Sequence, residues 1–181
     1  MARRWRRRLR RSVMYIAMAG LFGGMTFGVR AEGDRIPLGS PRVRSSVLRI
    51  VDLLSEASMR SKTFRELVAS IENTDGIVYV EPGSCRHGVR ACLSLSVTAG
   101  GGYRILRVMV DLATDMVALM ATIGHELRHA LEILTHPTVR TTEQAYMFYS
   151  REAATSRDVF ETRAAIQTGL AVEQEIGRLR N

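Results

Sequence analysis

Acidic residues are missing from the first 31 positions of this 181-residue chain. Eight arginines lie there, whereas all 18 acidic residues and the remaining 18 basic ones follow from Glu32 onward. The formal net charge of +8 therefore belongs to the N-terminus, and the rest of the chain is balanced. A nucleic-acid-binding domain would need clustered Lys and Arg of its own, so we expect no nucleic-acid partner.

Cysteine is also scarce, since Cys85 and Cys92 are the only two. Their C-x6-C spacing, with His87 between them, matches no common zinc module, so a Cys/His metal site is the weaker of two interpretations. If the protein is exported, an oxidising compartment favours a disulfide between the two cysteines. That disulfide would close the short loop 86–91.

The N-terminal segment has the three parts of an export signal. Arginines at positions 3–11 form a basic region, residues 13–29 are apolar, and Val29-Arg30-Ala31 is typical of a cleavage site. We therefore expect residues 1–31 to be a cleavable signal peptide of a periplasmic or secreted protein. The alternative is an uncleaved membrane anchor, because an apolar stretch of about 17 residues is at the short limit for a span.

Hydrophobic periodicity predicts a linker at residues 32–41 and a single α+β domain at 42–181. Helices are expected at 42–58, from an N-cap at Thr63 to about 71, at 115–134, at 141–153 and at 157–179. Strands are expected at 77–81, 93–97 and 103–110. The last two should form a hairpin through the glycines at 100–102. The class is thus a small antiparallel sheet of about three strands on one long helix, with a helical C-terminal half.

The long helix at 115–134 contains His125-Glu126-Leu127-Arg128-His129, which is the pattern HExxH. Residues four apart share a helix face, so His125 and His129 can present two imidazoles to one metal ion. Glu126 lies beside that ion without binding it. A general base is needed there to take a proton from a metal-bound water.

A helical wheel places the two histidines opposite the apolar face of this helix. The expected core residues are Met116, Met120, Ile123, Leu127, Leu131 and Leu134. The histidines instead have the small residues Ala118, Ala121 and Thr122 as neighbours. A helix packed on the sheet by its apolar face would turn both histidines towards a second layer or a cleft.

The HExxH motif resembles that of the zincin metallopeptidases, a superfamily in which it lies on the active-site helix. Arg128 departs from the usual pattern, which has uncharged residues between the Glu and the second His. The metzincin branch places a third His six residues after the second, but Thr135 occupies that position and His136 is one residue off. Metzincin geometry is therefore rejected.

The gluzincin branch takes its third ligand, a Glu, from a later helix, often in a Glu-x-x-Ala-Asp setting. The segment Glu161 to Ala165 keeps the Glu and the Ala, while Ala165 replaces the Asp that orients a ligand histidine. The resemblance thus implies Glu161 as the third ligand, with small residues after it allowing two helices to approach. Glu152 is the rival, and Glu143 and His136 remain further alternatives.

The resemblance implies an exported zinc metallopeptidase that binds Zn²⁺ and hydrolyses a protein or peptide substrate, with Glu126 as general base. It also implies that the substrate lies along the edge strand before the helix, for which residues 103–110 are the candidate. An oxyanion partner is expected among Tyr146, Tyr149 and His136. The alternatives are a zincin-like protein of the cell envelope that binds metal or peptide without catalysis, and a domain whose HExxH is fortuitous.

Overall fold

The computed structural model describes residues 42–178 apart from 86–87, 114, 153 and 157–158, and it describes the backbone alone of residues 152, 154–156 and 159. The expected signal peptide and linker, residues 1–41, lie outside this range. Within the described range, no helix is long and apolar enough to cross a membrane.

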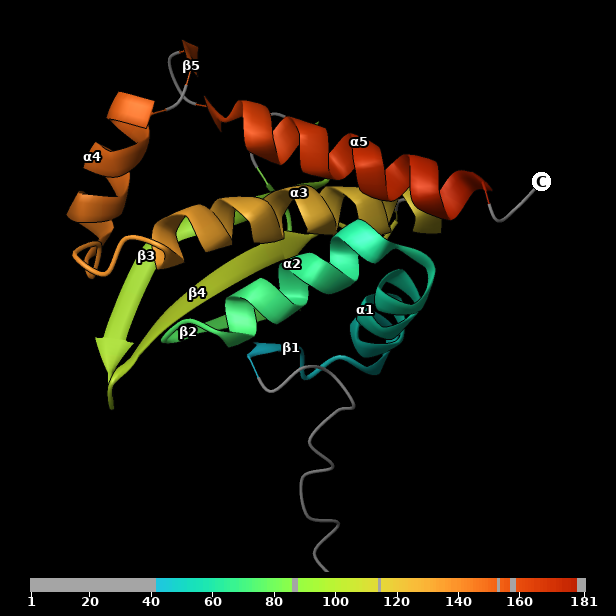
Figure 1. Cartoon of the computed structure of the whole chain (residues 1–181), viewed down its shortest axis with the longest axis horizontal. Helices are drawn as coiled ribbons and strands as arrows, with labels where there is room; N and C mark the ends of the chain where they lie inside the picture. The colour runs from blue at the N-terminus through green and yellow to red at the C-terminus, as the bar shows by residue number, and fades with distance from the viewer. Residues whose placement is uncertain (1–41, 86–87, 114, 153, 157–158, 179–181) are drawn as a thin grey trace, which may run out of the picture. The chain divides into compact units, whose positions relative to one another are not determined.

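The described chain forms an α+β domain with a helical C-terminal half, which confirms the predicted class (Figure 1). The helices are α1 (Leu48–Arg60), α2 (Lys62–Glu72), α3 (Met116–Leu134), α4 (Thr142–Glu152) and α5 (Arg163–Arg178). The strands are β1 (Val43–Arg44), β2 (Gly76–Pro82), β3 (Ala91–Gly100), β4 (Tyr103–Val110), β5 (Ala154–Ser156) and β6 (Val159–Glu161).

The main sheet has four strands in the order β1-β2-β4-β3 and is mixed. In this sheet β2 runs parallel to both β1 and β4, and the described β3–β4 pair alone is antiparallel, so the expectation of an antiparallel sheet of about three strands is wrong. The expectation that residues 103–110 form an edge strand is wrong, because β2 and β3 occupy both sides of β4. β3 is the edge strand nearest the HExxH helix in sequence, and its first residues contact that helix.

The predicted hairpin between β3 and β4 is confirmed. Gly100 pairs with Tyr103, so the turn consists of Gly101 and Gly102. Their φ angles of 59° and 84° lie in the left-handed region, which two-residue hairpin turns of this kind require and which glycine adopts without strain.

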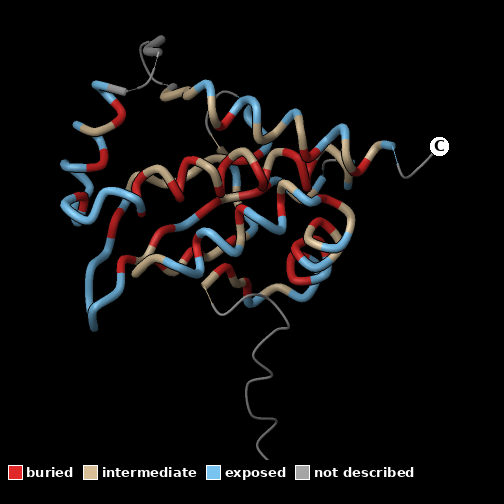
Figure 2. The backbone as a smooth tube through the Cα atoms, in the orientation of Figure 1, coloured by how far each residue is buried: buried red, intermediate tan, exposed pale blue. Residues whose placement is uncertain are grey.

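Helix α3 occupies the centre of the domain, packed on the sheet with α2 and α5 against it (Figure 1). It begins at Asp115, whose carboxylate accepts hydrogen bonds from the backbone N–H groups of Val117 and Ala118 at 3.0 and 3.3 Å. Buried residues line most of its length (Figure 2). The predicted core face is buried except for Met116 in the first turn, which is 47% exposed.

Three predicted helix starts differ from the observed ones. The first helix begins at Leu48, because Val43–Arg44 pairs with β2 as a strand. Ser61, rather than Thr63, caps α2, and its hydroxyl accepts a hydrogen bond from the N–H of Phe64. The last helix begins at Arg163 instead of 157, because Val159–Glu161 forms a hairpin with Ala154–Ser156.

A buried arginine holds the C-terminal end of α3. Arg104 on β4 is 1% exposed and forms a salt bridge with Asp75, and its Nε donates to the Asp75 carboxylate at 2.9 Å. The same guanidinium donates to four backbone carbonyls at and beyond the helix end, those of Ile133, Leu134, His136 and Val139. Arg104 therefore satisfies helix carbonyls that have no partner within α3.

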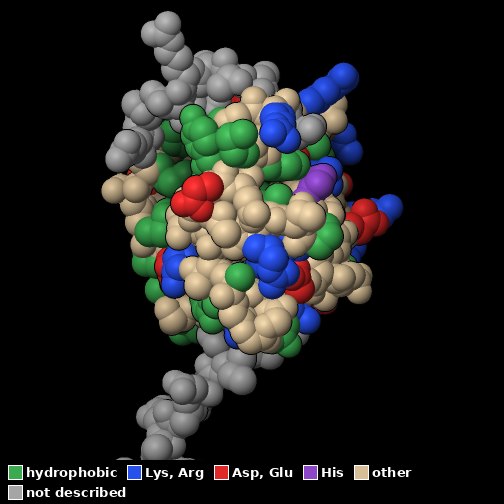
Figure 3. All heavy atoms as spheres, turned by 90° about the vertical axis from the view of Figure 1, so that its left-hand side faces the viewer, with side chains coloured by type: hydrophobic (Ala, Val, Ile, Leu, Met, Phe, Trp, Pro, Cys, Tyr) green, Lys and Arg blue, Asp and Glu red, His purple; other side chains and the backbone are tan. Residues whose placement is uncertain are grey.

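One outer face of the domain shows basic and acidic side chains interspersed, with hydrophobic side chains gathered at one end (Figure 3). No extended area of a single charge sign is visible on this face.

Candidate metal centre

The structure brings His125, His129 and Glu161 together, with the two histidines on α3 and the carboxylate at the end of β6. Glu161 Oε2 lies 3.1 Å from His125 Nε2 and 3.9 Å from His129 Nε2. One potential ligand atom from each residue lies within 4.8 Å of the others, which makes this a group that could hold a metal ion. Glu161 thus reaches the site from a short strand and not, as expected, from a helix.

The donor set fits a cation. In a tetrahedral site with bonds of about 2.0–2.1 Å, ligand atoms lie about 3.3 Å apart, so small side-chain movements bring all three to bonding distance. Glu161 Oε2 is moreover a buried oxygen without a hydrogen bond of suitable geometry, although it faces both imidazoles. A buried, unsatisfied carboxylate oxygen is costly unless a cation or donor compensates it.

Glu132 orients His129 and was missed by the sequence interpretation. Its Oε2 lies 3.1 Å from His129 Nδ1, and its Oε1 accepts a hydrogen bond of 2.7 Å from the Thr162 hydroxyl. A proton on Nδ1 leaves Nε2 as the free lone pair, directed towards Glu161. Burial alone would raise the pKa of Glu132, but the hydrogen bonds from His129 and Thr162 hold it below its usual value. Its spacing, three residues after His129, was the available signal.

His125 is held where α3 and α5 approach closely. A Cβ added to Gly169 of α5 would lie 3.3 Å from the Cβ of His125 and 3.6 Å from its Nδ1. Burial, reinforced by the nearby His129, lowers the pKa of His125. The neutral form that results is the form that binds metal ions.

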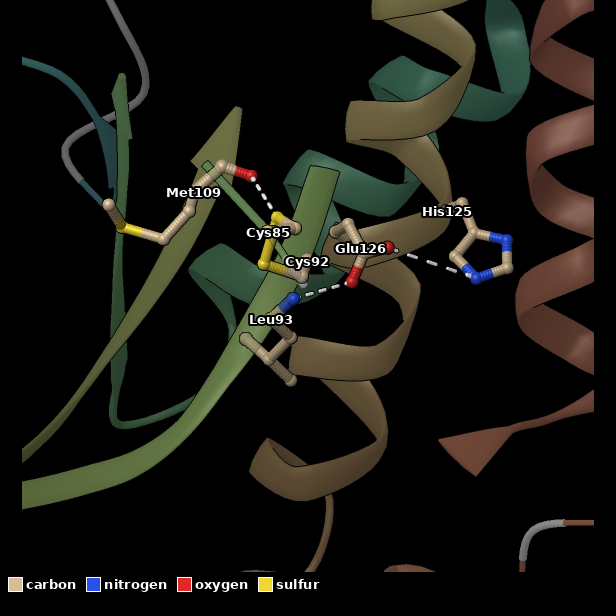
Figure 4. Close-up of a disulfide and its surroundings, with 6 residues drawn as sticks. All are labelled: Cys85, Cys92, Leu93, Met109, His125 and Glu126. Atoms are coloured by element: carbon tan, nitrogen blue, oxygen red, sulfur yellow. Dashed lines mark hydrogen bonds and ion pairs between the residues drawn. A yellow bond between two sulfur atoms is a disulfide. The ribbon is translucent and has the colours of Figure 1, made fainter. Parts of the chain in front are cut away.

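Glu126 points from α3 towards the start of β3 (Figure 4). Its Oε2 accepts a hydrogen bond of 2.6 Å from the Leu93 N–H, and its Oε1 lies 4.0 Å from His125 Nε2. Glu126 is 6% exposed, and this burial raises the pKa of its carboxyl to about 7. It is therefore a carboxyl group that exchanges a proton near neutral pH, placed beside the three potential ligands.

The alternative ligands do not join this group. Glu143 is exposed at the start of α4, and His136 Nδ1 lies 2.8 Å from the backbone carbonyl of Glu132. The side chains of Glu152 and His87 lie outside the described residues.

The expected oxyanion partners are placed elsewhere. The Tyr149 hydroxyl is buried and donates to the backbone carbonyl of His129 at 2.6 Å, which fixes the helix position of that ligand. Burial raises the pKa of Tyr149. Tyr146 and His136 are not among the described residues that line the pocket beside the three ligands.

An open pocket of about 480 Å³ adjoins the group, lined partly by His125, Glu126 and Glu161. The small residues that the wheel placed next to the histidines, Ala118, Ala121 and Thr122, line it as well. The expected cleft on the histidine face is therefore present, between α3, α5 and the segment that precedes β3.

Cys85 and Cys92 lie at disulfide distance, with their sulfur atoms 2.08 Å apart, as expected (Figure 4). Cys92 directly precedes Leu93, whose N–H binds Glu126. The disulfide therefore ties the strand that holds Glu126 to the end of the preceding segment, and a metal site made from these cysteines is not formed.

Comparisons of the chain with models of protein families, with curated proteins and with solved structures found no match.

Replacing Glu132 by Ala is expected to lower the affinity of the site for a divalent metal ion by roughly 10–100-fold, because His129 loses the partner that favours its tautomer and ring orientation. Competition with a chromophoric chelator measures this affinity. The exposed Glu143→Ala substitution is the matched control and should leave it unchanged. Equal affinities in the two variants would show that Glu132 does not support the metal centre.

Proposed function

We propose that this protein is an exported zinc-dependent metallopeptidase, with His125, His129 and Glu161 as ligands and Glu126 as general base. The observation that carries the proposal is the position of Glu126, a buried carboxyl whose Oε1 lies 4.0 Å from His125 Nε2, beside two imidazoles and an unsatisfied carboxylate oxygen. Structural zinc sites use four protein ligands, whereas three ligands beside an open pocket are typical of a catalytic one.

Zinc, when bound, supplies a Lewis acid and makes a water molecule at the open position more acidic. Glu126 would accept a proton from that water and pass it to the leaving amine, because its carboxyl lies beside the three ligands and burial raises its pKa above the usual value of a glutamate. The Leu93 N–H holds one carboxylate oxygen, which leaves Oε1 on the side of His125. The Glu132 carboxylate, 3.1 Å from His129 Nδ1, favours the tautomer with its proton on Nδ1, which leaves Nε2 to bind a metal ion.

The disulfide supports the exported location, because disulfides persist in oxidising compartments and are rare in the cytosol.

The test is zinc content together with hydrolysis of an unstructured protein substrate. We expect one zinc ion per purified chain by elemental mass spectrometry, and hydrolysis that stops on chelation and returns when zinc is added. His129→Ala should lose both the metal and the activity, while Glu143→Ala should keep both. Bound zinc without hydrolysis would indicate a metal-binding protein that is not a peptidase. A purified chain that binds no zinc, whether or not it hydrolyses the substrate, would overturn the metal centre itself.

A further inference from the structure

The pocket beside the three ligands has an apolar wall open to solvent. Val89 precedes β3, and Ile166 and Leu170 lie on α5; these three side chains are 43%, 46% and 51% exposed. Large apolar side chains are normally buried, and their grouping in one pocket marks a place where an apolar ligand group binds. The wall adjoins Glu126 and Glu161, so such a group would be held next to the proposed reaction centre.

A single basic residue, Arg90, lines the same pocket among the described residues. Its backbone is fixed on two sides: the Asp111 N–H donates to its carbonyl at 2.8 Å, and the disulfide at Cys92 follows two residues later. The Arg90 side chain is exposed, and its five guanidinium donors form no hydrogen bond or ion pair with another described residue. The fixed backbone thus places an exposed cation at the pocket.

The charge arrangement restricts what Arg90 can bind. The other charged residues that line the pocket are Glu126, Glu161 and Glu173. All three carboxylates repel an anion, so among the described lining residues Arg90 is the position that attracts an anionic group. The planar guanidinium fork matches the two oxygens of a carboxylate.

We propose that this pocket binds a peptide with an apolar side chain next to a carboxylate, and that Arg90 binds the carboxylate. The inference rests on the proposed function, because it names the substrate class of the same site. The carboxylate is that of a peptide C-terminus or of an Asp or Glu side chain, and the experiment separates these two sources.

The test compares three N-acetylated peptides of equal length with the zinc-loaded protein. One ends in Leu with a free carboxylate, one ends in Leu amide, and one carries Asp after Leu and ends in an amide. A charge-assisted pair with Arg90 should give one of the two carboxylate peptides a kcat/KM roughly 10–100-fold above that of the Leu amide peptide. A preference for the peptide with the free C-terminus identifies a C-terminal carboxylate as the bound group, and a preference for the Asp peptide identifies a side-chain carboxylate.

The Arg90→Gln variant should lose this preference while keeping its zinc. Arg49→Gln, which removes an exposed arginine on α1 away from the pocket, is the matched control and should keep the wild-type preference. A wild-type protein that treats the three peptides alike, or a preference that persists in Arg90→Gln, would overturn the inference.

Calorimetric binding of the same peptides to zinc-loaded Glu126→Gln separates this inference from the proposed function. One outcome is that the wild-type protein hydrolyses none of the peptides while Glu126→Gln binds the carboxylate peptides more tightly than the amide peptide. If that binding preference is lost when Arg90→Gln is added, the inference holds and the peptidase proposal fails. If hydrolysis occurs without dependence on Arg90, the peptidase proposal holds and the inference fails.

Discussion

Glu126→Gln is expected to retain zinc and to lower kcat for hydrolysis by roughly 10²–10⁴-fold, the usual contribution of a general base. Gln keeps the size of the side chain and an oxygen that can accept from the Leu93 N–H, so the fold and the ligand positions are preserved. It cannot take a proton from water. Zinc content and kcat measured on the same preparation give the result, and unchanged hydrolysis would rule out this mechanism.

Without metal, the Glu126→Gln variant should become more stable relative to the wild-type protein as the pH rises. The pKa of Glu126 is raised from 4.5 to about 7 in the folded chain, so folding binds a proton that the unfolded chain has released. The associated stability is fully present below about pH 4.5 and is lost as the pH rises through 7. At about 1.4 kcal/mol per pKa unit, the loss is about 3 kcal/mol.

Urea unfolding of the metal-free protein between pH 5 and pH 8 measures this difference. The stability of Glu126→Gln relative to the wild type should grow over that range, because Gln does not ionise. The exposed Glu66→Gln substitution is the control and should show no comparable growth. A difference that stays constant with pH would contradict the raised pKa.

Replacing Arg104 by Met is expected to cost about 3–5 kcal/mol of unfolding free energy, because a buried guanidinium with several charge-assisted hydrogen bonds is lost. The substitution removes the main counter-charge of Asp75 and the hydrogen bonds that the guanidinium donates to the carbonyls of Ile133 and Leu134 at the end of α3. For a domain of this size, Tm should fall on the order of 10–20 °C.

Arg107→Met provides the matched control for this measurement. Arg107 lies three residues along β4, but its side chain is 46% exposed and its ion pair with Glu81 spans 3.6 Å. Exposed pairs of this kind contribute at most about 1 kcal/mol. Thermal or urea unfolding that shows equal losses for the two variants would contradict the role assigned to Arg104.

Local signals predicted the parts of the fold that local interactions determine. The helix expected at 115–134 begins where the Asp115 carboxylate caps its first turn, and the glycines at 100–102 marked the hairpin. The order of the sheet depends on pairing between distant segments. β1 has only two residues and exists because Val43 pairs with Val78, which no local pattern reveals.

The residues of the candidate site were likewise predicted where a local pattern determines them and missed where distant segments must meet. His125, Glu126 and His129 follow from one helical motif, and Glu161 was implied by the resemblance to gluzincins, although its strand was taken for a helix. The pairing of β5 with β6 decides that element, and each strand has only three residues. The position of Glu132 followed from helix spacing, but its role depends on Thr162, which approaches only in the folded chain.

The position of Glu161 has a consequence for the folding of the C-terminal half. His129 and Glu161 are 32 positions apart, so an ion bound to both closes a loop that contains α4 and the β5–β6 hairpin. The ion would act as a cross-link, and the entropy of closing the loop would enter its affinity. At free zinc about 1,000-fold above Kd, binding adds about 4 kcal/mol to the free energy of unfolding. Zinc supply would then govern how long this half of the chain survives proteolysis.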